Sequence, residues 1–354
     1  MRILMYSRAY GNIAGGIEKM SLDLATGLSQ KGHEVTIASL DPSGSESFFV
    51  WPNSVNWIQL GIGNPDSKNS IAVKLKRIFA IRKVAKKGLF EAAVGFQIGS
   101  YFLLRISLIG IPIRVIAAER NAPTLFEYIE HGKRKKYFSN IFLMFASRIA
   151  VQFEDYRLMY PKWLRHKIVV TPNWVELNPT KAKNVSISTI RILYVGRLTF
   201  QKNVKVLIGA LGFLPENFTL TIIGTGPDLE ELKLTARNFG VRVSFLEPHT
   251  NLYEVYPQFN LFCLPSRWEG FPNVLTEALA SGLPGVGFAE CAGIPQLIEE
   301  NLNGCIATGM GNPETLSAAL LKASAIRFDS DEIALSVKKY SFENYIQEWE
   351  RALS

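Results

Sequence analysis

The chain has 354 residues, of which 47% are hydrophobic and 20% are charged, and its formal net charge at pH 7 is +8. This composition excludes a wholly disordered chain, and the length favours two domains. The three cysteines lack the paired spacing of a disulfide framework, and they lack metal-ligand spacing with the four histidines, so we expect a reduced, cytoplasmic setting and no metal site.

Short apolar runs alternate with longer amphipathic segments along the chain, which is typical of βαβ units around parallel sheets. A strand is predicted over 2–6 and a helix over 17–31. Further strands of the first half are predicted at 35–39, 92–96, 114–118, 147–152 and 167–171. The most apolar stretches, 101–118 and 138–153, contain arginines. They are shorter than the roughly 20 consecutive apolar residues that a membrane-spanning helix needs. We therefore expect no segment that crosses a membrane.

Basic charge is concentrated in the first half of the chain. Residues 1–172 contain 24 Lys and Arg against 12 Asp and Glu, whereas residues 173–354 contain 15 against 19. A helix over 71–87 would carry Lys74 and Arg77 on a basic surface, and would place on its apolar face Ile71, Leu75, Ile78, Ile81 and Ala85. A second basic cluster lies at 133–136.

Basic amphipathic helices lie on anionic membranes or bind phosphate groups, although a solvated helix face and a basic loop are the simpler alternative. We predict that the first half contacts an anionic membrane surface and no nucleic acid.

The pattern restarts after a polar junction at 181–189. Strands are predicted at 191–196, 219–224, 243–246, 261–265 and 285–288. The first of these, RILYVG, resembles the RILMY of residues 2–6. The sequence therefore predicts an α/β protein with two doubly wound Rossmann-like domains, 1–172 and 173–339, facing across a cleft with ligands at the carboxyl ends of the strands.

A carboxylate pair lies in the stretch EGFPNVLTEALASGLP, residues 269–284. A helix beginning near Pro272 would offer the free amides of 273–275 to a phosphate. Glu269 precedes this helix and Glu277 lies about one turn inside it. Because carboxylates repel phosphate but accept hydrogen bonds from hydroxyls, this pair favours a sugar phosphate ligand. A strand–loop–helix turn with a capping glutamate is the alternative.

This stretch is similar to the Glu-x7-Glu signature of family-4 retaining glycosyltransferases, which have the GT-B fold. The resemblance implies that Glu269 contacts hydroxyls of the donor sugar and that Glu277 holds the ribose. It also implies a donor site lined by Gly270, Phe271, Pro272, Asn273 and Val274. Residues 196–203 look like the Gly-Arg-Leu…Lys element of that family, in which Arg197 and Lys202 would clamp the diphosphate and stabilise the leaving group.

Two glycine turns accompany these motifs. The turn at 224–226 lacks the third glycine of a dinucleotide fingerprint, which argues against a nicotinamide oxidoreductase. In the resembled family this turn lies beside the nucleotide, so Gly224 and Gly196 are predicted to line the donor. Gly15 and Gly16 open the first helix, where glycine allows close backbone approach to an anion, and the resemblance implies contact with the diphosphate or the acceptor. A flexible turn is the alternative for Gly15 and Gly16.

Three polar residues, Glu119, Arg120 and Asn121, directly follow the strand at 114–118. Many members of the resembled family have a histidine here. The Glu-Arg-Asn sequence of this chain instead resembles a subset of that family, the bacterial polysaccharide and lipid-linked oligosaccharide transferases. We predict catalytic roles for Glu119 and Arg120, in addition to Glu269, Arg197 and Lys202. Four residues are predicted to bind the acceptor of the sugar: Asn121, Asn173, Lys74 and Arg77. A loop cap is the alternative for Asn121.

The resemblance as a whole implies a retaining, metal-independent hexosyltransferase that moves a hexose or N-acetylhexosamine from a UDP-sugar, without a cofactor. The expected acceptor is a polyprenyl-diphosphate-linked glycan of surface polysaccharide biosynthesis, reached from the cytoplasmic face of the inner membrane. The last helix, about 340–354, would pack back on the first domain. A UDP-sugar epimerase of the same fold and a non-catalytic basic membrane-binding protein are the alternatives.

Overall fold

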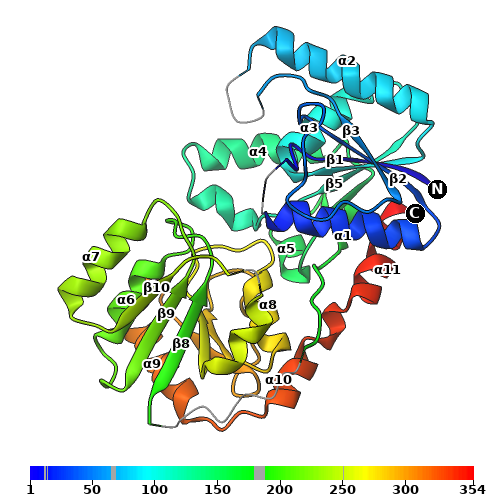
Figure 1. Cartoon of the computed structure of the whole chain (residues 1–354). Helices are drawn as coiled ribbons and strands as arrows, with labels where there is room; N and C mark the ends of the chain where they lie inside the picture. The colour runs from blue at the N-terminus through cyan, green and yellow to red at the C-terminus, as the bar shows by residue number, and fades with distance from the viewer. Residues whose placement is uncertain (12, 14, 65–68, 179–187, 250) are drawn as a thin grey trace. The chain divides into compact units, whose positions relative to one another are not determined.

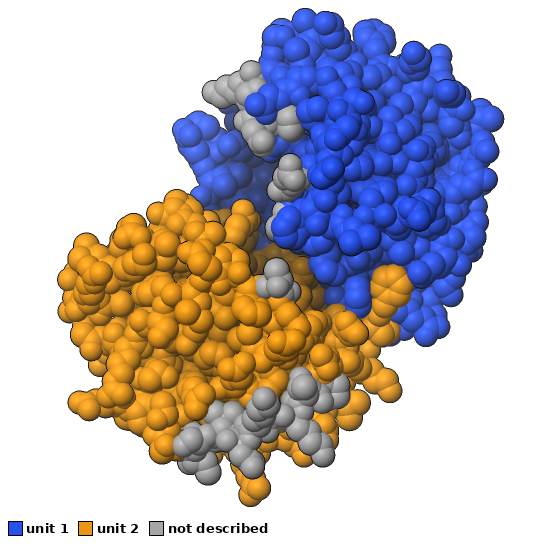
Figure 2. All heavy atoms as spheres, viewed as in Figure 1, with its two compact units in different colours: residues 1–174, 343–354 blue, residues 175–342 orange. Residues whose placement is uncertain are grey.

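The computed structural model describes residues 1–11, 13, 15–64, 69–178, 188–249 and 251–354 (Figure 1). The chain divides into two compact units, coloured separately in Figure 2. Unit 1 comprises residues 1–174 and 343–354, and unit 2 comprises residues 175–342. Of the junction predicted at 181–189, residues 181–187 lie outside the described residues.

Unit 1 contains a parallel sheet with the strand order β3-β2-β1-β4-β5-β6-β7. Its strands are β1 Arg2–Tyr6, β2 Glu34–Ser39, β3 Val55–Gln59, β4 Ala92–Phe96, β5 Arg114–Ala118, β6 Arg148–Val151 and β7 Ile168–Val170. The central strands are buried on both faces, which explains why they read as continuous apolar runs in the sequence. The order reverses between β1 and β4, so the loops after these strands flank a topological switch point.

The helices of unit 1 are α1 Gly16–Gln30, α2 Ile71–Gly88, α3 Gln97–Ser107, α4 Gly132–Leu143, α5 Glu154–Leu158 and α11 Phe342–Leu353, with short 3₁₀ turns η1 Pro123–Glu127 and η2 Arg165–Lys167. Helices α3 and α4 pack side by side. The rings of Phe102 and Phe142 lie 4.2 Å apart, and the Tyr101 hydroxyl donates a hydrogen bond to the Phe142 carbonyl oxygen at 3.0 Å.

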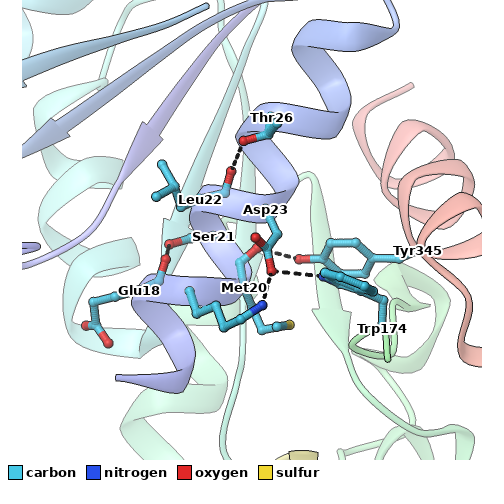
Figure 3. Close-up of polar contacts among 9 residues, drawn as sticks. Glu18, Met20, Ser21, Leu22, Asp23, Thr26, Trp174 and Tyr345 are labelled. Carbon is cyan, nitrogen blue, oxygen red and sulfur yellow. Dashed lines mark hydrogen bonds and ion pairs between the residues drawn. The ribbon is translucent and has the colours of Figure 1, made fainter. Parts of the chain in front are cut away.

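The C-terminal helix α11 completes unit 1 by packing beside α1 (Figure 3). The Tyr345 hydroxyl donates to the Met20 carbonyl oxygen at 2.8 Å. The Trp174 indole N–H donates to the Asp23 carboxylate at 3.0 Å, and that carboxylate also pairs with Lys19. Two segments that are far apart in sequence are therefore held on α1.

Unit 2 contains a second parallel sheet with the strand order β10-β9-β8-β11-β12-β13. Its strands are β8 Ile190–Val195, β9 Phe218–Ile223, β10 Val243–Leu246, β11 Leu261–Leu264, β12 Gly285–Phe288 and β13 Gly304–Ala307. Its helices are α6 Val204–Leu211, α7 Leu229–Phe239, α8 Asn273–Ala280, α9 Pro313–Ala325 and α10 Ser330–Ser336, with 3₁₀ turns η3 Leu252–Glu254, η4 Tyr256–Gln258 and η5 Lys338–Tyr340. Here the order reverses between β8 and β11.

The two sheets confirm the predicted pair of Rossmann-like doubly wound domains. The cleft between the domains stays a prediction. The helix predicted over 71–87 is present as α2, and its apolar face is buried only in part. Ile81 and Ala85 are buried, whereas Ile71 and Leu75 are 75% and 48% exposed. Within the described part of the chain, no helix is both long enough and apolar enough to span a membrane.

Candidate functional site

Two loops of unit 2 meet at the switch point of its sheet. One loop, 196–203, follows β8, and the other, 265–272, follows the neighbouring strand β11. The Arg267 amide donates to the Gln201 carbonyl oxygen at 2.8 Å, and the Gln201 side-chain amide donates to the Trp268 carbonyl oxygen at 2.9 Å. Because adjacent parallel strands release their loops at the same edge, the two motifs found in the sequence form one continuous surface.

Lys202 and Glu269 form an ion pair at the centre of these loops. The distance between Lys202 Nζ and Glu269 Oε1 is 2.6 Å, and the side chains are only 15% and 6% exposed. A buried charge is strongly destabilising unless it is paired, so each side chain holds the other in place. A lysine ammonium has three N–H donors, and the bond to Glu269 uses one of them. Two donors of Lys202 are therefore not used by this pair.

Arg197 lies at the surface of the same loop, where its side chain is exposed. Its carbonyl oxygen accepts a hydrogen bond from the Tyr194 hydroxyl at 3.0 Å. Burial raises the pKa of Tyr194 well above its ordinary value, and the nearby Glu269 carboxylate raises it further. Tyr194 is thus a neutral donor beneath the loop, which also contains Gly196. The structure brings Gly196, Lys202 and Glu269 together and leaves the Arg197 side chain at the rim.

Helix α8 begins at Asn273, as the sequence predicts, without a side-chain cap at Pro272. The prediction that the amides of 273–275 are free is wrong for two of them. The Asn273 amide donates to the Phe271 carbonyl oxygen, and the Leu275 amide donates to the Pro272 carbonyl oxygen. The turn that starts the helix is tight, so it uses these donors itself. Gly270 and Phe271 are buried in this turn, and Val274 is half-buried in the helix.

Glu277 is oriented by a tyrosine that the sequence analysis missed. The Tyr256 hydroxyl, in η4, donates to Glu277 Oε2 at 3.1 Å. Burial raises the pKa of Tyr256 well above its ordinary value, and the Glu277 carboxylate adds to this effect. Tyr256 belongs to no motif, and no feature of a single sequence indicates its contact with a residue 21 positions away.

The glycine turn after β9 packs backbone to backbone against the 196–203 loop. A Cβ atom on Gly224 would lie 2.0 Å from the Gly196 carbonyl oxygen, and one on Gly226 would lie 2.2 Å from the Leu198 carbonyl oxygen. The Leu198 amide donates to the Thr225 carbonyl oxygen at 2.9 Å. Packing alone therefore requires glycine here, and a nucleotide-lining role for Gly224 stays a prediction.

Replacing Gly224 by alanine should lower the free energy of unfolding by at least about 3 kcal/mol, because both steric overlap and its φ of +152° oppose a side chain. Gly240→Ala is the matched control, since Gly240 also has a positive φ but nothing within 4 Å of the added Cβ. The control should lose about 1–2 kcal/mol. Urea denaturation of both variants measures the difference, and equal losses would contradict the packing role.

In unit 1, the three polar residues after β5 have different surroundings, and Arg120 is held by hydrogen bonds. The Arg120 guanidinium donates to the Thr171 carbonyl oxygen at 2.9 Å, to the Thr171 hydroxyl at 2.6 Å and to Asn173 Oδ1 at 3.3 Å. Burial lowers the pKa of Arg120 to about 10. The guanidinium carbon of Arg120 also lies over the Trp349 ring, 5.1 Å from the ring centroid. These contacts bring Arg120 and Asn173 together and show Arg120 as a structural clamp, so its catalytic role and the acceptor role of Asn173 stay predictions.

Glu119 and Asn121 instead line a cavity of about 780 Å³ within unit 1. Glu119 is 9% exposed, and its Oε1 atom is buried without a hydrogen-bond partner among the described residues. Burial raises the pKa of Glu119 to about 7, although the Arg120 charge opposes this shift. The catalytic role of Glu119 stays a prediction, and its carboxyl group is able to hold a proton near neutral pH.

The raised pKa of Glu119 makes stability depend on pH. Between the ordinary carboxyl pKa of 4.5 and the folded value of about 7, the folded state binds more protons than the unfolded state, so stability falls as pH rises through this range. Between about pH 5 and about pH 8 the loss from this group should reach about 3 kcal/mol. Denaturation at both pH values should show a smaller loss in Glu119→Gln than in the unaltered chain. The same loss in both proteins would contradict the buried-acid account.

The remaining predicted residues lie elsewhere in unit 1. Gly15 and Gly16 open α1, and Gly15 supplies no side-chain cap. Lys74 is exposed on α2. The placement of Arg77 on the outer basic surface is wrong, because Arg77 is buried and donates to the carbonyl oxygens of Ile62 and Asn64 at 2.9 and 3.2 Å. It supports the preceding loop, and its predicted role in binding the acceptor stays without support.

No group of three or more His, Cys, Asp or Glu that could hold a metal ion occurs among the residues that the structure describes. Cys263, Cys291 and Cys305 are free and buried.

Comparison with known proteins places these features in context. Residues 180–340 match the family model described as "Glycosyl transferases group 1". The chain is 25% identical to an uncharacterized glycosyltransferase of Haemophilus influenzae over 96% of both chains. It is 24% identical to the Campylobacter jejuni GalNAc-alpha-(1->4)-GalNAc-alpha-(1->3)-diNAcBac-PP-undecaprenol alpha-1,4-N-acetyl-D-galactosaminyltransferase, over 83% of this chain and 81% of that protein.

Among solved structures, Anabaena HepE in complex with UDP-glucose has the same fold. Its TM-score is 0.77 with 16% sequence identity, and the match covers 100% of this chain and 99% of HepE.

Proposed function

We propose that this glycosyltransferase of group 1, which has the GT-B fold, transfers a hexose or N-acetylhexosamine from a UDP-sugar to a polyprenyl-diphosphate-linked glycan with retention of configuration. The observation that carries the proposal is the buried Lys202–Glu269 pair at the switch point of unit 2, where α/β sheets bind nucleotides. The UDP-glucose bound by HepE and the undecaprenol-linked substrate in the name of the Campylobacter relative support the same substrate classes here. We place the reaction in surface polysaccharide biosynthesis.

The donor is held by opposite charges in adjacent loops. Lys202 donates to a diphosphate oxygen through an N–H that Glu269 does not use, while the Glu269 carboxylate accepts hydrogen bonds from sugar hydroxyls. Glu277, positioned by Tyr256, accepts from the ribose hydroxyls. The exposed Arg197 moves onto the diphosphate as a second cation. Fixed cations at the leaving group stabilise the charge that develops there, which is the main source of the rate increase.

Transfer proceeds on one face of the donor sugar. The acceptor oxygen forms a bond to the anomeric carbon as the bond from that carbon to the β-phosphate oxygen breaks. The acceptor proton passes to the departing diphosphate, so the products are UDP and the extended glycan. Lys202 and Arg197 supply the positive charge in these steps.

Unit 1 provides the membrane surface in this proposal. In α2, Ile71 and Phe79 are 75% and 65% exposed beside several lysines, and α4 exposes Tyr137 and Phe138 next to its basic first turn. Apolar side chains flanked by Lys and Arg are typical of helices that lie in the interface of an anionic bilayer. The excess basic charge of residues 1–172 supports the same orientation.

The function is tested by incubating the purified chain with UDP-hexoses and UDP-N-acetylhexosamines, with and without a polyprenyl-diphosphate glycan. We expect UDP release that requires the glycan, and a product whose new linkage keeps the anomeric configuration by NMR. Isomerisation of the UDP-sugar without an acceptor would indicate an epimerase instead. Vesicle binding without transfer or isomerisation would indicate a non-catalytic membrane-binding protein.

The membrane surface gives its own prediction. The double replacement of Ile71 and Phe79 by serine should weaken binding to vesicles with anionic lipid by at least about tenfold, because each side chain loses more than 1 kcal/mol of apolar burial. Leu321→Ser is the matched control, because Leu321 is 48% exposed on α9 of unit 2. Sedimentation with vesicles measures both. An equal effect of the control would contradict a membrane surface on α2.

A further inference from the structure

The cavity of about 780 Å³ lies wholly within unit 1, between α3, η1 and α4. This volume is in the range of sites for small-molecule ligands. One wall is polar and consists of Glu119 and Asn121, at the carboxyl end of β5. The other walls are predominantly apolar, with aromatic rings from Phe102, Phe126 and Phe142. An aqueous, sugar-like ligand would leave most of this surface without hydrogen bonds, so the walls favour an apolar chain.

The rim of the cavity is basic. Arg134 and Lys135 line it from the first turn of α4, where both are exposed. His131 lines it from the residue before the helix and pairs with the Glu130 carboxylate at 3.2 Å, so Arg134 and Lys135 provide the positive charge. The first turn of α4 contains no acidic residue, and His131 provides no side-chain cap. The positive end of the helix dipole and the positive side chains repel each other. An anion bound at this end would offset the charge of the side chains and of the dipole. The rim therefore favours a phosphate.

We propose that this cavity binds the apolar chain of a lipid that carries a phosphate or diphosphate, with the phosphate held by Arg134 and Lys135 at the first turn of α4. This inference rests on the proposed function and deepens it. It places the lipid part of the acceptor between α3 and α4, and it leaves Arg77, which already donates to two backbone carbonyl oxygens, out of the lipid site.

The test is calorimetry of the full chain with farnesyl diphosphate, with inorganic pyrophosphate and farnesol as the separate head and chain. Farnesyl diphosphate should bind at least about tenfold more tightly than either fragment, because the cavity holds both parts at once. Binding no tighter than pyrophosphate would overturn the role of the apolar walls. Dihexanoyl phosphatidic acid represents a membrane phospholipid, and tighter binding of it than of farnesyl diphosphate would overturn the link to the acceptor.

Two variants and two controls locate the site. Phe102→Asp places a charge on the apolar wall, and Arg134→Glu reverses a charge at the rim; each should weaken farnesyl diphosphate binding at least about tenfold. The controls are Lys133→Glu, in the same turn of α4, and Phe145→Asp, which is 51% exposed just beyond α4; neither residue lines the cavity. Both controls should weaken binding clearly less than Phe102→Asp and Arg134→Glu, because neither side chain lines the cavity. Equal losses in Lys133→Glu and Arg134→Glu would overturn the assignment, and thermal melting checks that each variant is folded.

UDP binding, measured in the same proteins, separates this inference from the proposed function. The cavity variants should keep the UDP affinity of the unaltered chain, because the donor loops lie in unit 2. A chain that binds farnesyl diphosphate but no UDP would keep the cavity and overturn the proposed function. A chain that binds UDP but no farnesyl diphosphate would do the reverse.

Discussion

Replacing Glu269 by glutamine should lower the turnover number for sugar transfer about 100- to 1,000-fold, the loss typical of removing one fixed group that acts on the transition state. The amide keeps an oxygen that accepts a hydrogen bond from Lys202, but it removes the negative charge that a donor hydroxyl would meet. The free energy of unfolding should fall by up to about 3 kcal/mol, because Lys202 keeps its charge in a site that is largely buried. Steady-state kinetics and urea denaturation measure the two effects separately.

Glu231→Gln is the matched control for this variant. Glu231 also pairs with a lysine in unit 2, at 2.7 Å from Lys205, but both side chains are 61% exposed. Exposed pairs contribute about 0–1 kcal/mol, so this variant should keep both its turnover and its stability. Full turnover in Glu269→Gln, or an equal fall of the turnover number in Glu231→Gln, would show that Glu269 does not act in the donor site.

Replacing Lys202 by methionine should have the larger effect on stability. The change leaves the Glu269 carboxylate, only 6% exposed, without its cation, which costs about 3–5 kcal/mol. UDP affinity should fall about 10- to 100-fold through the loss of a charged hydrogen bond, while uridine affinity stays the same. Calorimetry with UDP and with uridine separates the diphosphate grip from contacts with the base.

The double variant Lys202→Met with Glu269→Gln tests whether the two residues act as a pair. It should recover much of the stability that Lys202→Met loses, because residue 269 then carries no negative charge that needs the Lys202 cation. Additive losses of stability would show that the two side chains do not depend on each other. Equal weakening of UDP and uridine would show that Lys202 does not contact the diphosphate.

Most strands were predictable because they are buried on both faces and read as apolar runs. Two strands were missed, β3 and β13, and both lie at an edge of their sheet. The sequence of β3, VNWIQ, contains two polar residues, and only Val55 of this strand is buried. β13 has four residues and begins with glycine, but β12 shares both features and was predicted, so they do not explain why β13 was missed. The other two edge strands, β7 and β10, were predicted, so a position at the edge of the sheet does not by itself hide a strand.

The candidate site was predictable as two motifs but not as one set of contacts. Glu269 and Lys202 are 67 positions apart, and their direct pairing depends on the adjacency of β8 and β11 in the sheet. The partners Tyr256 of Glu277 and Thr171 of Arg120 are single residues outside any motif. Arg77 was misplaced because helical periodicity does not show which polar side chain a neighbouring loop will cover.

The central claim is that the paired loops of unit 2 hold a UDP-sugar for transfer, with Glu269 on the sugar and Lys202 on the diphosphate. Its most direct test is the rate of acceptor-dependent UDP release by the unaltered chain, Glu269→Gln and Glu231→Gln under identical conditions. We predict release by the unaltered chain and Glu231→Gln, and a rate lower by at least about 100-fold in Glu269→Gln. The same rate in all three proteins would contradict the account.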